Sequence, residues 1–436
     1  MTPTSRIRAA ELLFLAVLAV LAYAPSLNLP LIADDYPNIS QARSWGAPGG
    51  LLALLGDAQF RLRSTSYWAM CALWNMAGMN PIAYHTASLL LHVCNTWLLF
   101  ALVRSWGSRH GPQPAFPTCS ALYAAAFFAV HEGHQEAVMW FSAINELQLF
   151  FFGVAALVCW VRDCAADRPS WKLSAGGAVL FALALLSKES AVVVLPLCLL
   201  VSPPRRWKRL WPHAVLCALA VASIAASRSN SFRFSDGSFS LSAPFWITLP
   251  QSLARLMWIW GWPALAVVFL GSSRGTSGET GRAAKRAAVT ALAWMAIALL
   301  PYSFLTYSTR IPSRQTYLAS AGLALLFGLA AATWLEVWPH RRRLAAAVFA
   351  LMLVHNSVYL WTKKRAQFQE RAAPTDQLIA LARRSSAPIF VQCFPLPSMV
   401  ADEAVRLAAN RSPQTLLWTS AAAQAHPDAV TFCAGR

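Results

Sequence analysis

The stretch that decides the fold is ELLFLAVLAVLAYAPSLNLPLIADDYPNIS, residues 11–40. Its apolar run extends from about residue 9 to residue 32 and is long enough to cross the ~30 Å hydrocarbon core of a bilayer. The run is too long for the apolar core of a signal peptide, and no small-residue cleavage site follows it, so we expect an uncleaved first span. Two adjacent carboxylates, Asp34 and Asp35, stand where the chain leaves this span.

Similar apolar runs recur along the whole chain. Of the 436 residues, 57% are hydrophobic and 12% are charged, about half the charged fraction of a soluble protein. The runs predict an all-α polytopic membrane protein with a bundle of about eleven transmembrane helices. The predicted spans are 9–32, 83–104, 118–134, 143–161, 173–187, 190–203, 211–227, 250–270, 287–304, 316–336 and 344–361.

The net charge of +18 follows the expected membrane topology. Lys and Arg gather in every second loop, at 6–8, 104–109, 162–172, 205–209, 274–286 and 341–343. By the positive-inside rule these loops and the N-terminus face the cytoplasm, and the loops between them face the exterior. The excess of Lys and Arg is therefore explained by membrane topology and by contact with membrane lipid, and we expect no nucleic-acid partner.

The first exterior loop, residues 33–82, is too long for a simple connector. Its apolar spacing predicts one or two amphipathic helices lying on the membrane surface. We expect a membrane domain over residues 1–361 and a small C-terminal appendage over residues 362–436.

The side of this C-terminal tail stays open at the level of sequence. Eleven spans place it outside, whereas the basic run TKKRAQFQER, residues 362–371, favours the inside. If the tail is outside, Cys393 and Cys433 are candidates for a disulfide.

The acidic pair Asp34 and Asp35 has two interpretations. A general base for a hydroxyl must be a carboxylate or a histidine within hydrogen-bond reach. A second carboxylate raises the pKa of one member, or lets the pair hold a divalent cation. The alternative is an Asx turn that leads into an interfacial helix.

The segment HEGHQEAVMWFSAINEL, residues 131–147, lacks the His spacing of a zinc protease. On a helix, His131 and His134 still share a face with Glu132 or Glu136, which is a candidate metal site. A hydrogen-bonded cluster that caps a helix at the membrane surface is the alternative.

Two further segments place charge at the outer ends of spans. In LLSKESAVVVLPL, residues 185–197, Lys188 and Glu189 form either an ion pair across a tight hairpin or a lipid-phosphate site. YSTRIPSRQTYLASAG, residues 307–322, holds Arg310, Arg314 and Tyr317. Arginine on the exterior side needs a partner, and its planar fork suits a phosphate; snorkelling to the interface is the alternative.

Together these motifs resemble the GT-C superfamily of integral-membrane glycosyltransferases, in particular bacterial relatives of the tetratricopeptide-repeat protein O-mannosyltransferases. The resemblance covers about residues 1–360 and rests on motif order and spacing. The matching segments are the acidic pair, NPIAYHTASLLLHVCN (80–95), HEGHQEAVMWF (131–141), LLSKE (185–189) and RQTYLASAG (314–322). The tail shows no tetratricopeptide periodicity, and RLRS (61–64) replaces the usual Arg-Pro pair, which leaves the roles of Arg61 and Arg63 open.

The resemblance implies transfer of a sugar from a polyprenyl-phosphate donor to a hydroxyl acceptor on a protein or an envelope glycan, usually with inversion. It implies that Asp34 or Asp35 is the base. It implies that Arg314 binds the donor phosphate, with help from Lys188, Tyr317 and Arg310. It also implies that four further residues line the cavity: His131, His134, Glu136 and Glu189.

The resemblance requires no cofactor and leaves open a divalent Mg or Mn ion, with Asp35, His131 and His134 as candidate ligands. It implies a multi-pass protein of the bacterial inner membrane whose active site faces the periplasm. A transporter or flippase for lipid-linked sugars is the alternative, because it too needs a charged cavity and a lipid groove.

Overall fold

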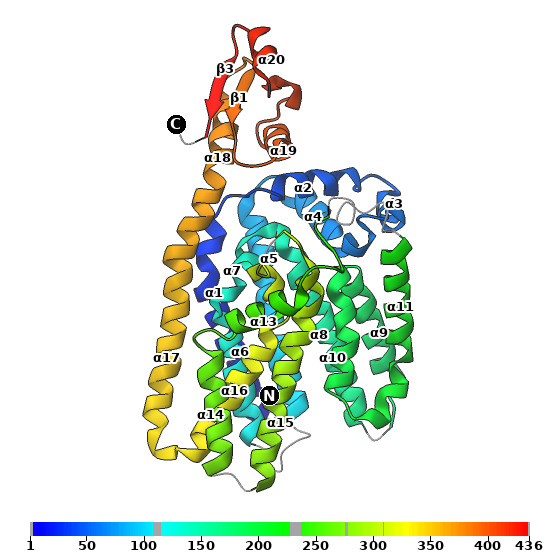
Figure 1. The fold of residues 1–436 in the computed structure, drawn as a ribbon, viewed down its shortest axis with the longest axis vertical. Coiled ribbons are helices and arrows are strands. Elements are labelled where there is room, and N and C mark those ends of the chain that lie inside the picture. Colours follow the sequence, from blue (N-terminus) through cyan, green and yellow to red (C-terminus); the bar gives the residue numbers. More distant parts are fainter. Residues whose placement is uncertain are drawn as a thin grey trace.

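The computed structural model describes residues 3–107, 115–166, 168–226, 237–274, 278–307 and 309–434. Figure 1 shows a bundle of long helices, with short helices across one end and a small tail beyond them. Arg109 of the second basic cluster lies outside the described residues.

The bundle is built from helices that match the predicted apolar runs. Their bounds are α1 (Pro3–Tyr23), α5 (Pro81–Gly107), α6 (Ala115–Val130), α8 (Ile144–Ala165), α9 (Trp171–Leu185), α10 (Val194–Leu200), α11 (Trp211–Ala226), α13 (Phe245–Leu256), α14 (Gly261–Arg274), α15 (Gly278–Leu299), α16 (Ser320–Val337) and α17 (Arg342–Tyr359). Short helices join them: η1 (Ala24–Asn28), η3 (Glu132–His134), α7 (Gln135–Met139), η4 (Phe141–Ala143), η5 (Glu189–Val193), η6 (Pro204–Leu210), η7 (Leu300–Phe304), η8 (Ser313–Thr316) and η9 (Pro339–Arg341).

The predicted count of eleven spans is not confirmed. Among the described residues, seven helices are long and apolar enough to cross a membrane, or eight if the bent pair α13–α14 counts as one span. Three further apolar helices, 120–130, 171–185 and 189–200, are shorter. The polytopic helical class is nevertheless as predicted.

The predicted span over residues 250–270 is broken into two helices. Helices α13 and α14 meet at 78° across a short break. Pro263 stands in the first turn of α14, where its missing N–H is tolerated, so a new helix begins there instead of α13 continuing.

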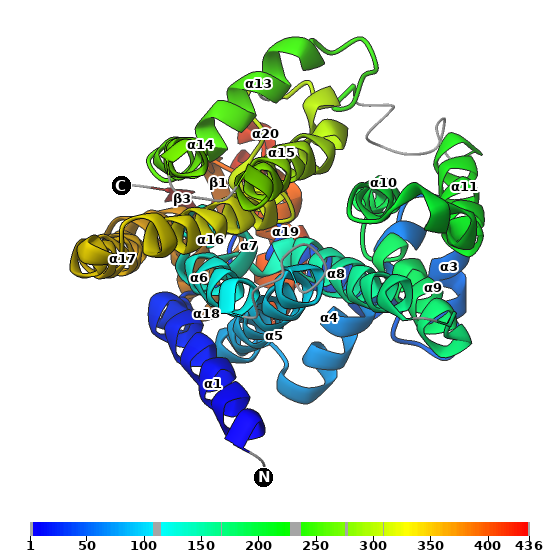
Figure 2. The same ribbon diagram turned by 90° about the horizontal axis from the view of Figure 1, so that it is seen from below.

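The centre of the bundle is formed by α5, α6, α8 and α16: α5 packs against α6 and α8, and α6 packs against α16 (Figure 2). Glycines on α16 permit this close approach. A Cβ at Gly328 would lie 2.3 Å from the Ser120 carbonyl oxygen, and one at Gly322 would lie 2.6 Å from that of Ala291. Small residues at such crossings let membrane helices gain van der Waals contact, which is their main source of association.

The long first loop folds into the layer across the end of the bundle (Figure 1). It contains α2 (Asp35–Ser44), α3 (Gly50–Gly56), η2 (Arg61–Arg63) and α4 (Ser64–Ala77), which is more than the one or two helices predicted. Tyr36 and Ile39 of α2 pack with Tyr67 and Met70 of α4 in a buried cluster, so the layer has its own small core.

The tail begins without a break from the last span. Helix α17 continues through the π-helical turn η10 (Leu360–Lys364) into α18 (Arg365–Arg384), past the predicted boundary at residue 361. Beyond it, a parallel sheet of order β2-β1-β3 packs with α19. Its elements are β1 (Ile389–Cys393), α19 (Ser398–Ala408), η11 (Pro413–Thr415), β2 (Leu416–Leu417), α20 (Ser420–Gln424) and β3 (Val430–Cys433).

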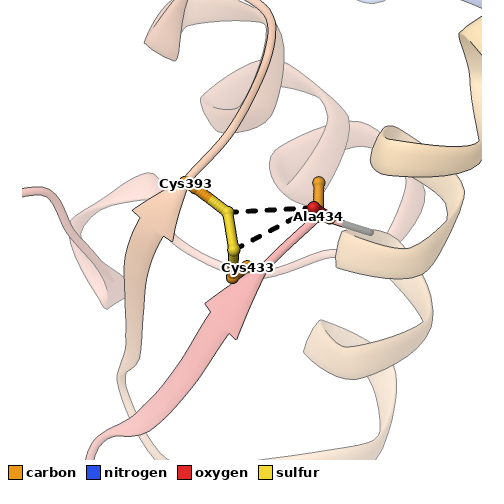
Figure 3. Close-up of a disulfide and its surroundings, with 3 residues drawn as sticks. All are labelled: Cys393, Cys433 and Ala434. Carbon is orange, nitrogen blue, oxygen red and sulfur yellow. Dashed lines mark hydrogen bonds between the residues drawn. A yellow bond between two sulfur atoms is a disulfide. The ribbon is translucent and has the colours of Figure 1, made fainter. Parts of the chain in front are cut away.

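Two contacts fix the tail on the first loop. Val400 and Ala404 of α19 join the buried cluster of α2, and Arg406 donates a hydrogen bond to Ser40. The tail therefore lies at the same end of the bundle as the acidic pair. The candidate disulfide between Cys393 and Cys433 is present, and it joins the C-terminal ends of β1 and β3 (Figure 3).

Candidate active site

A cavity of about 520 Å³ collects charged side chains from distant parts of the chain. Asp34 comes from the start of the first loop and Arg63 from η2. Lys188 and Glu189 come from the turn after α9, and Arg314 comes from η8. Four of the ten predicted site residues thus line one cavity: Asp34, Lys188, Glu189 and Arg314.

The two adjacent carboxylates have different surroundings. Asp35 is fully buried and accepts hydrogen bonds from the Ile32 N–H at 2.8 Å, the Ser142 N–H at 2.7 Å and the Ser142 hydroxyl at 2.6 Å. Burial raises the pKa of Asp35 to about 7, against the effect of these hydrogen bonds. Its oxygens are therefore committed to tying the first loop to η4, and Asp35 does not line the cavity.

The turn that precedes Asp35 carries backbone strain. Ala33 has φ of 44°, in the left-handed region that costs an alanine roughly 1 kcal/mol or more. The bond from Ile32 to the Asp35 carboxylate closes this turn and directs the following chain into α2. Asp35 thus stabilises a turn that leads into a helix, which was one of the two interpretations of the acidic pair. Its neighbour Asp34 lines the cavity.

Asp34 lies among cations. Burial raises the pKa of Asp34, while the guanidinium groups of Arg314 and Arg63 act in the opposite direction. Asp34 is exposed to the cavity. A raised pKa makes a carboxylate a stronger base, and the two cations favour its ionised form.

Arg63 is a site residue whose role the sequence left open. Its Nε lies 3.6 Å from Oε1 of Glu189, and both side chains line the cavity. Arg61 instead donates from Nε to the Asp57 carbonyl at 3.0 Å and is not among the lining residues. Of the two arginines in RLRS, only Arg63 therefore belongs to the site.

Lys188 is held by two residues that the sequence analysis missed. Its ammonium pairs with Glu146, and it lies 4.9 Å from the ring centre of Tyr302, whose hydroxyl donates to Glu146 at 2.9 Å. Burial lowers the pKa of Lys188, and the Glu146 carboxylate opposes this shift. Glu146 carried a usable signal, because an acid inside an apolar helix is costly and needs a partner.

Arg314 is anchored at the cavity wall. Its guanidinium lies 4.8 Å from the ring centre of Trp140, within cation–π range. Its backbone N–H donates to Oε2 of Glu136 at 3.2 Å, and Oε1 of Glu136 lies 3.7 Å from Arg371 of α18. Burial acts to raise the pKa of Glu136, but the Ser313 hydroxyl and Arg314 outweigh it and lower that pKa. Glu136 does not line the cavity; it holds a residue that does.

The other predicted residues lie outside the cavity lining. Tyr317 is fully buried, and its hydroxyl lies 2.7 Å from Nδ1 of His92. His134 bonds from Nε2 to the Ser320 hydroxyl at 2.6 Å, and the ring of His134 lies 4.5 Å from that of Tyr317. His131 faces Glu132 at 3.3 Å. These residues form a packed layer with α6 and α16, but neither His131 nor His134 caps a helix through its side chain, so the capping part of the alternative is wrong. Arg310 is exposed and is not a lining residue.

The candidate metal ligands are not brought together. Within the described ranges, no group of three or more His, Cys, Asp or Glu side chains is placed to hold a metal ion. Asp35 is occupied by Ile32 and Ser142, and His134 by Ser320. The three candidate ligands therefore form no common site in the described part of the chain, and no step is assigned to a metal.

Comparison with known proteins agrees with this architecture. ArnT from Cupriavidus metallidurans bound to undecaprenyl phosphate matches with a TM-score of 0.58 over 99% of this chain and 90% of that chain, at 14% identity. The chain has the GT-C glycosyltransferase fold. The oligosaccharyltransferase AglB from Archaeoglobus fulgidus, in complex with an inhibitory peptide and a dolichol-phosphate, matches with a TM-score of 0.54 over 94% of this chain and 64% of that chain, at 11% identity.

Sequence similarity to known proteins covers part of the chain. Residues 65–227 match the family model of dolichyl-phosphate-mannose-protein mannosyltransferases. The protein O-mannosyl-transferase Tmtc1 of Drosophila melanogaster is 26% identical over 256 residues, or 53% of this chain. The chain spans 25% of that relative's length. The predicted resemblance to GT-C proteins is confirmed.

Proposed function

We propose that the chain transfers a sugar from a polyprenyl-phosphate donor to a hydroxyl acceptor at the extracytoplasmic face of a bacterial inner membrane. The observation that carries this proposal is the cavity in which Asp34 faces the cations of Arg63, Arg314 and Lys188. Glycosyl transfer from a lipid phosphate needs one group to take a proton and other groups to stabilise a leaving phosphate.

In the proposed reaction, Asp34 accepts the proton of the acceptor hydroxyl. The hydroxyl oxygen forms a bond to the anomeric carbon while the bond from that carbon to the phosphate oxygen breaks. The phosphate leaves with the electron pair, and Arg314 and Arg63 stabilise its added charge with planar donors. Attack opposite the leaving group inverts the anomeric centre.

The remaining residues position these groups. Asp35 fixes the turn that presents Asp34, and Glu136 fixes Arg314. Lys188 is already neutralised by Glu146, so we assign it the weaker part of phosphate binding. Asn145 and Tyr307 line the same cavity, and we assign them hydrogen bonds to the other sugar hydroxyls and to the acceptor.

The orientation and the sugar are also part of the proposal. Disulfides persist in oxidising compartments, and the Cys393–Cys433 bridge lies at the same end of the bundle as Asp34. The alternating basic loops support the same orientation. The matched family model supports mannose as the sugar and a protein hydroxyl as the acceptor; an envelope glycan is the other acceptor.

The test uses the purified full chain in liposomes, with polyprenyl-phosphate mannose as donor and a Ser/Thr-rich peptide or a lipid-linked glycan as acceptor. We expect Asp34→Asn to lower turnover about a hundredfold or more while donor binding is kept, since a base acts mainly in the transition state. Asp57→Asn is the matched control, because Asp57 caps the N–H groups of Gln59 and Phe60 in the same loop and the amide retains that cap.

Transfer by Asp34→Asn at the wild-type rate would overturn the assignment of the base. Movement of the donor across the bilayer with no transfer to any acceptor would instead favour the transporter alternative.

A further inference from the structure

The outer end of α17 carries a basic run that the proposed function does not use. Lys363, Lys364 and Arg365 follow the last apolar helix, at the same end of the bundle as the tail and the first loop. Lysine and arginine are disfavoured next to a span on the exterior side. A favourable interaction must therefore compensate for their presence there.

These cations converge with others from different elements. Lys364 interacts electrostatically with Lys363, with Arg371 of α18 and with Arg255 of α13. The acid in this set is Glu136, whose two oxygens already face Arg314 and Arg371. We call Arg255, Lys363, Lys364 and Arg371 the outer cation cluster. Its four cations outnumber the carboxylates that act on this region, Glu136 and Glu132, and this favours an anion there.

The backbone on both sides of the outer cation cluster is irregular. On one side the chain forms the π-helical turn η10, a geometry frequent at functional sites. On the other side α13 and α14 break at 78°, and Ile259 in the break has φ of 66°, which is strained for a β-branched residue. The rings of Trp260 and His355 lie 6.1 Å apart and connect the two sides. Broken helices in membrane proteins commonly present their free backbone groups to a ligand.

An apolar stripe leads along α17 to the outer cation cluster. Its members are spaced three or four residues apart, so they share one helix face, and each is 44–64% exposed: Leu344, Val348, Leu351, Val354, Val358 and Trp361. At the upper end the indole of Trp361 donates to the Leu21 carbonyl at 2.8 Å, as an interfacial tryptophan does. A lipid chain lying on this stripe brings its head group to the cations.

We propose that the outer cation cluster binds the phosphate head group of an anionic lipid of the outer leaflet, at a site separate from the Asp34 cavity. The cations neutralise the phosphate, and the ring of Tyr359, 5.3 Å from Lys364 Nζ and 5.7 Å from Lys363 Nζ, keeps both ammonium groups at the interface. Phospholipids and polyprenyl phosphate share this chemistry. The site does not depend on the chain being a glycosyltransferase.

Native mass spectrometry of the purified full chain tests the site, with phosphatidylglycerol, polyprenyl phosphate and zwitterionic phosphatidylethanolamine as separate probes. We expect phosphatidylglycerol to remain bound to the wild type and phosphatidylethanolamine to be lost. The double variant Lys363→Gln/Lys364→Gln should bind phosphatidylglycerol about 10- to 30-fold more weakly, since each surface cation contributes about fivefold.

Three further variants test whether the effect depends on charge, on position along α17, and on the cavity. Lys363→Arg/Lys364→Arg keeps the charge and should keep binding. Arg342→Gln/Arg343→Gln removes two exposed cations at the opposite end of α17 and should change nothing. Arg314→Gln removes a cavity cation and leaves every cation of the cluster in place, so it should weaken a polyprenyl phosphate bound in the cavity more than phosphatidylglycerol at the cluster.

Two results would overturn the proposal: equal phosphatidylglycerol binding by the wild type and Lys363→Gln/Lys364→Gln, or equal loss in the variant at the opposite end. If only polyprenyl phosphate is retained and the lysine variant loses it, the occupant is the carrier lipid itself. Failure of sugar transfer leaves all these binding results unaffected, so the two proposals fail separately.

Discussion

Glu136 accepts a hydrogen bond from the backbone N–H of Arg314 at 3.2 Å, which fixes the start of η8 at the edge of the cavity. The carboxylate lies 3.9 Å from the guanidinium of the same residue and 3.7 Å from that of Arg371. One partly buried acid thus connects the cavity residue Arg314 to the helix that carries the tail.

Substitution of Glu136 tests this connection. Glu136→Gln removes the charge, and we expect kcat to fall about 10- to 100-fold, a loss typical of residues that orient a catalytic group. KM for the donor should change less, because the guanidinium itself remains. Steady-state kinetics separates the two effects. Arg371→Gln, which leaves the bond to the Arg314 N–H in place, is the matched control and should lower kcat only a few-fold.

The buried Asp35 makes stability depend on pH. Its pKa in the folded protein is about 7, above the model-peptide value of about 3.9. The folded state therefore binds more protons than the unfolded state between these values, and stability falls as pH rises from about 4 to about 7. We expect the wild type to have a higher Tm at pH 5 than at pH 8, with this difference reduced in Asp35→Asn. Thermal unfolding in detergent at both pH values measures it; an unchanged difference in the variant would contradict the assignment.

Glu146 and Lys188 form a buried pair whose members cannot be removed singly without cost. Glu146→Gln leaves the Lys188 ammonium without its counter-ion, and we expect a loss of about 3 kcal/mol in unfolding free energy. The double variant Glu146→Gln/Lys188→Met should recover part of this loss, because no unpaired charge remains. A double-mutant cycle of unfolding free energies gives the coupling, and simple additivity would show that the pair is not stabilised by its own contact.

The two arginines of RLRS offer a matched comparison. Arg63→Gln removes a cavity cation that faces Glu189 and Asp34, and we expect kcat/KM to fall about tenfold or more. Arg61→Gln removes a side chain bound to the Asp57 carbonyl outside the cavity, so it should change kcat/KM less than twofold or so. Initial-rate measurements at low donor concentration compare them. If both variants lost the same fraction of kcat/KM, both arginines would act by stabilising the loop.

The sequence could identify Asp34, Lys188 and Arg314 because each is a charged residue at the outer end of an apolar run. That rule locates the correct end of the bundle and does not tell which face of a short helix turns toward a cavity. Tyr317 lies three residues after Arg314 and points into the packed layer beside His92. Similarly, Asp35 turns away from the cavity that its neighbour lines.

The sequence also could not predict which side chains from distant segments pair with one another. Glu146 precedes its partner Lys188 by 42 residues, and Arg371 lies far beyond its partner Glu136 in the chain. Hydrophobic periodicity locates helices but carries no information on which of them touch. The break between α13 and α14 escaped prediction for a related reason, since both halves are apolar and read as one continuous span.

The continuous rod of η9, α17, η10 and α18 has a mechanical consequence. Its 46 residues span about 70 Å, whereas a bilayer with its head groups is about 40 Å thick, so about 30 Å projects beyond the bilayer. Helices tilt to match the thickness of the surrounding bilayer. By simple leverage, a tilt of about 10° at the membrane displaces the far end of α18 by about 5 Å. Because Val400 and Ala404 of the tail pack on the first loop, a tilt of this rod is transmitted to the layer that holds the acidic turn.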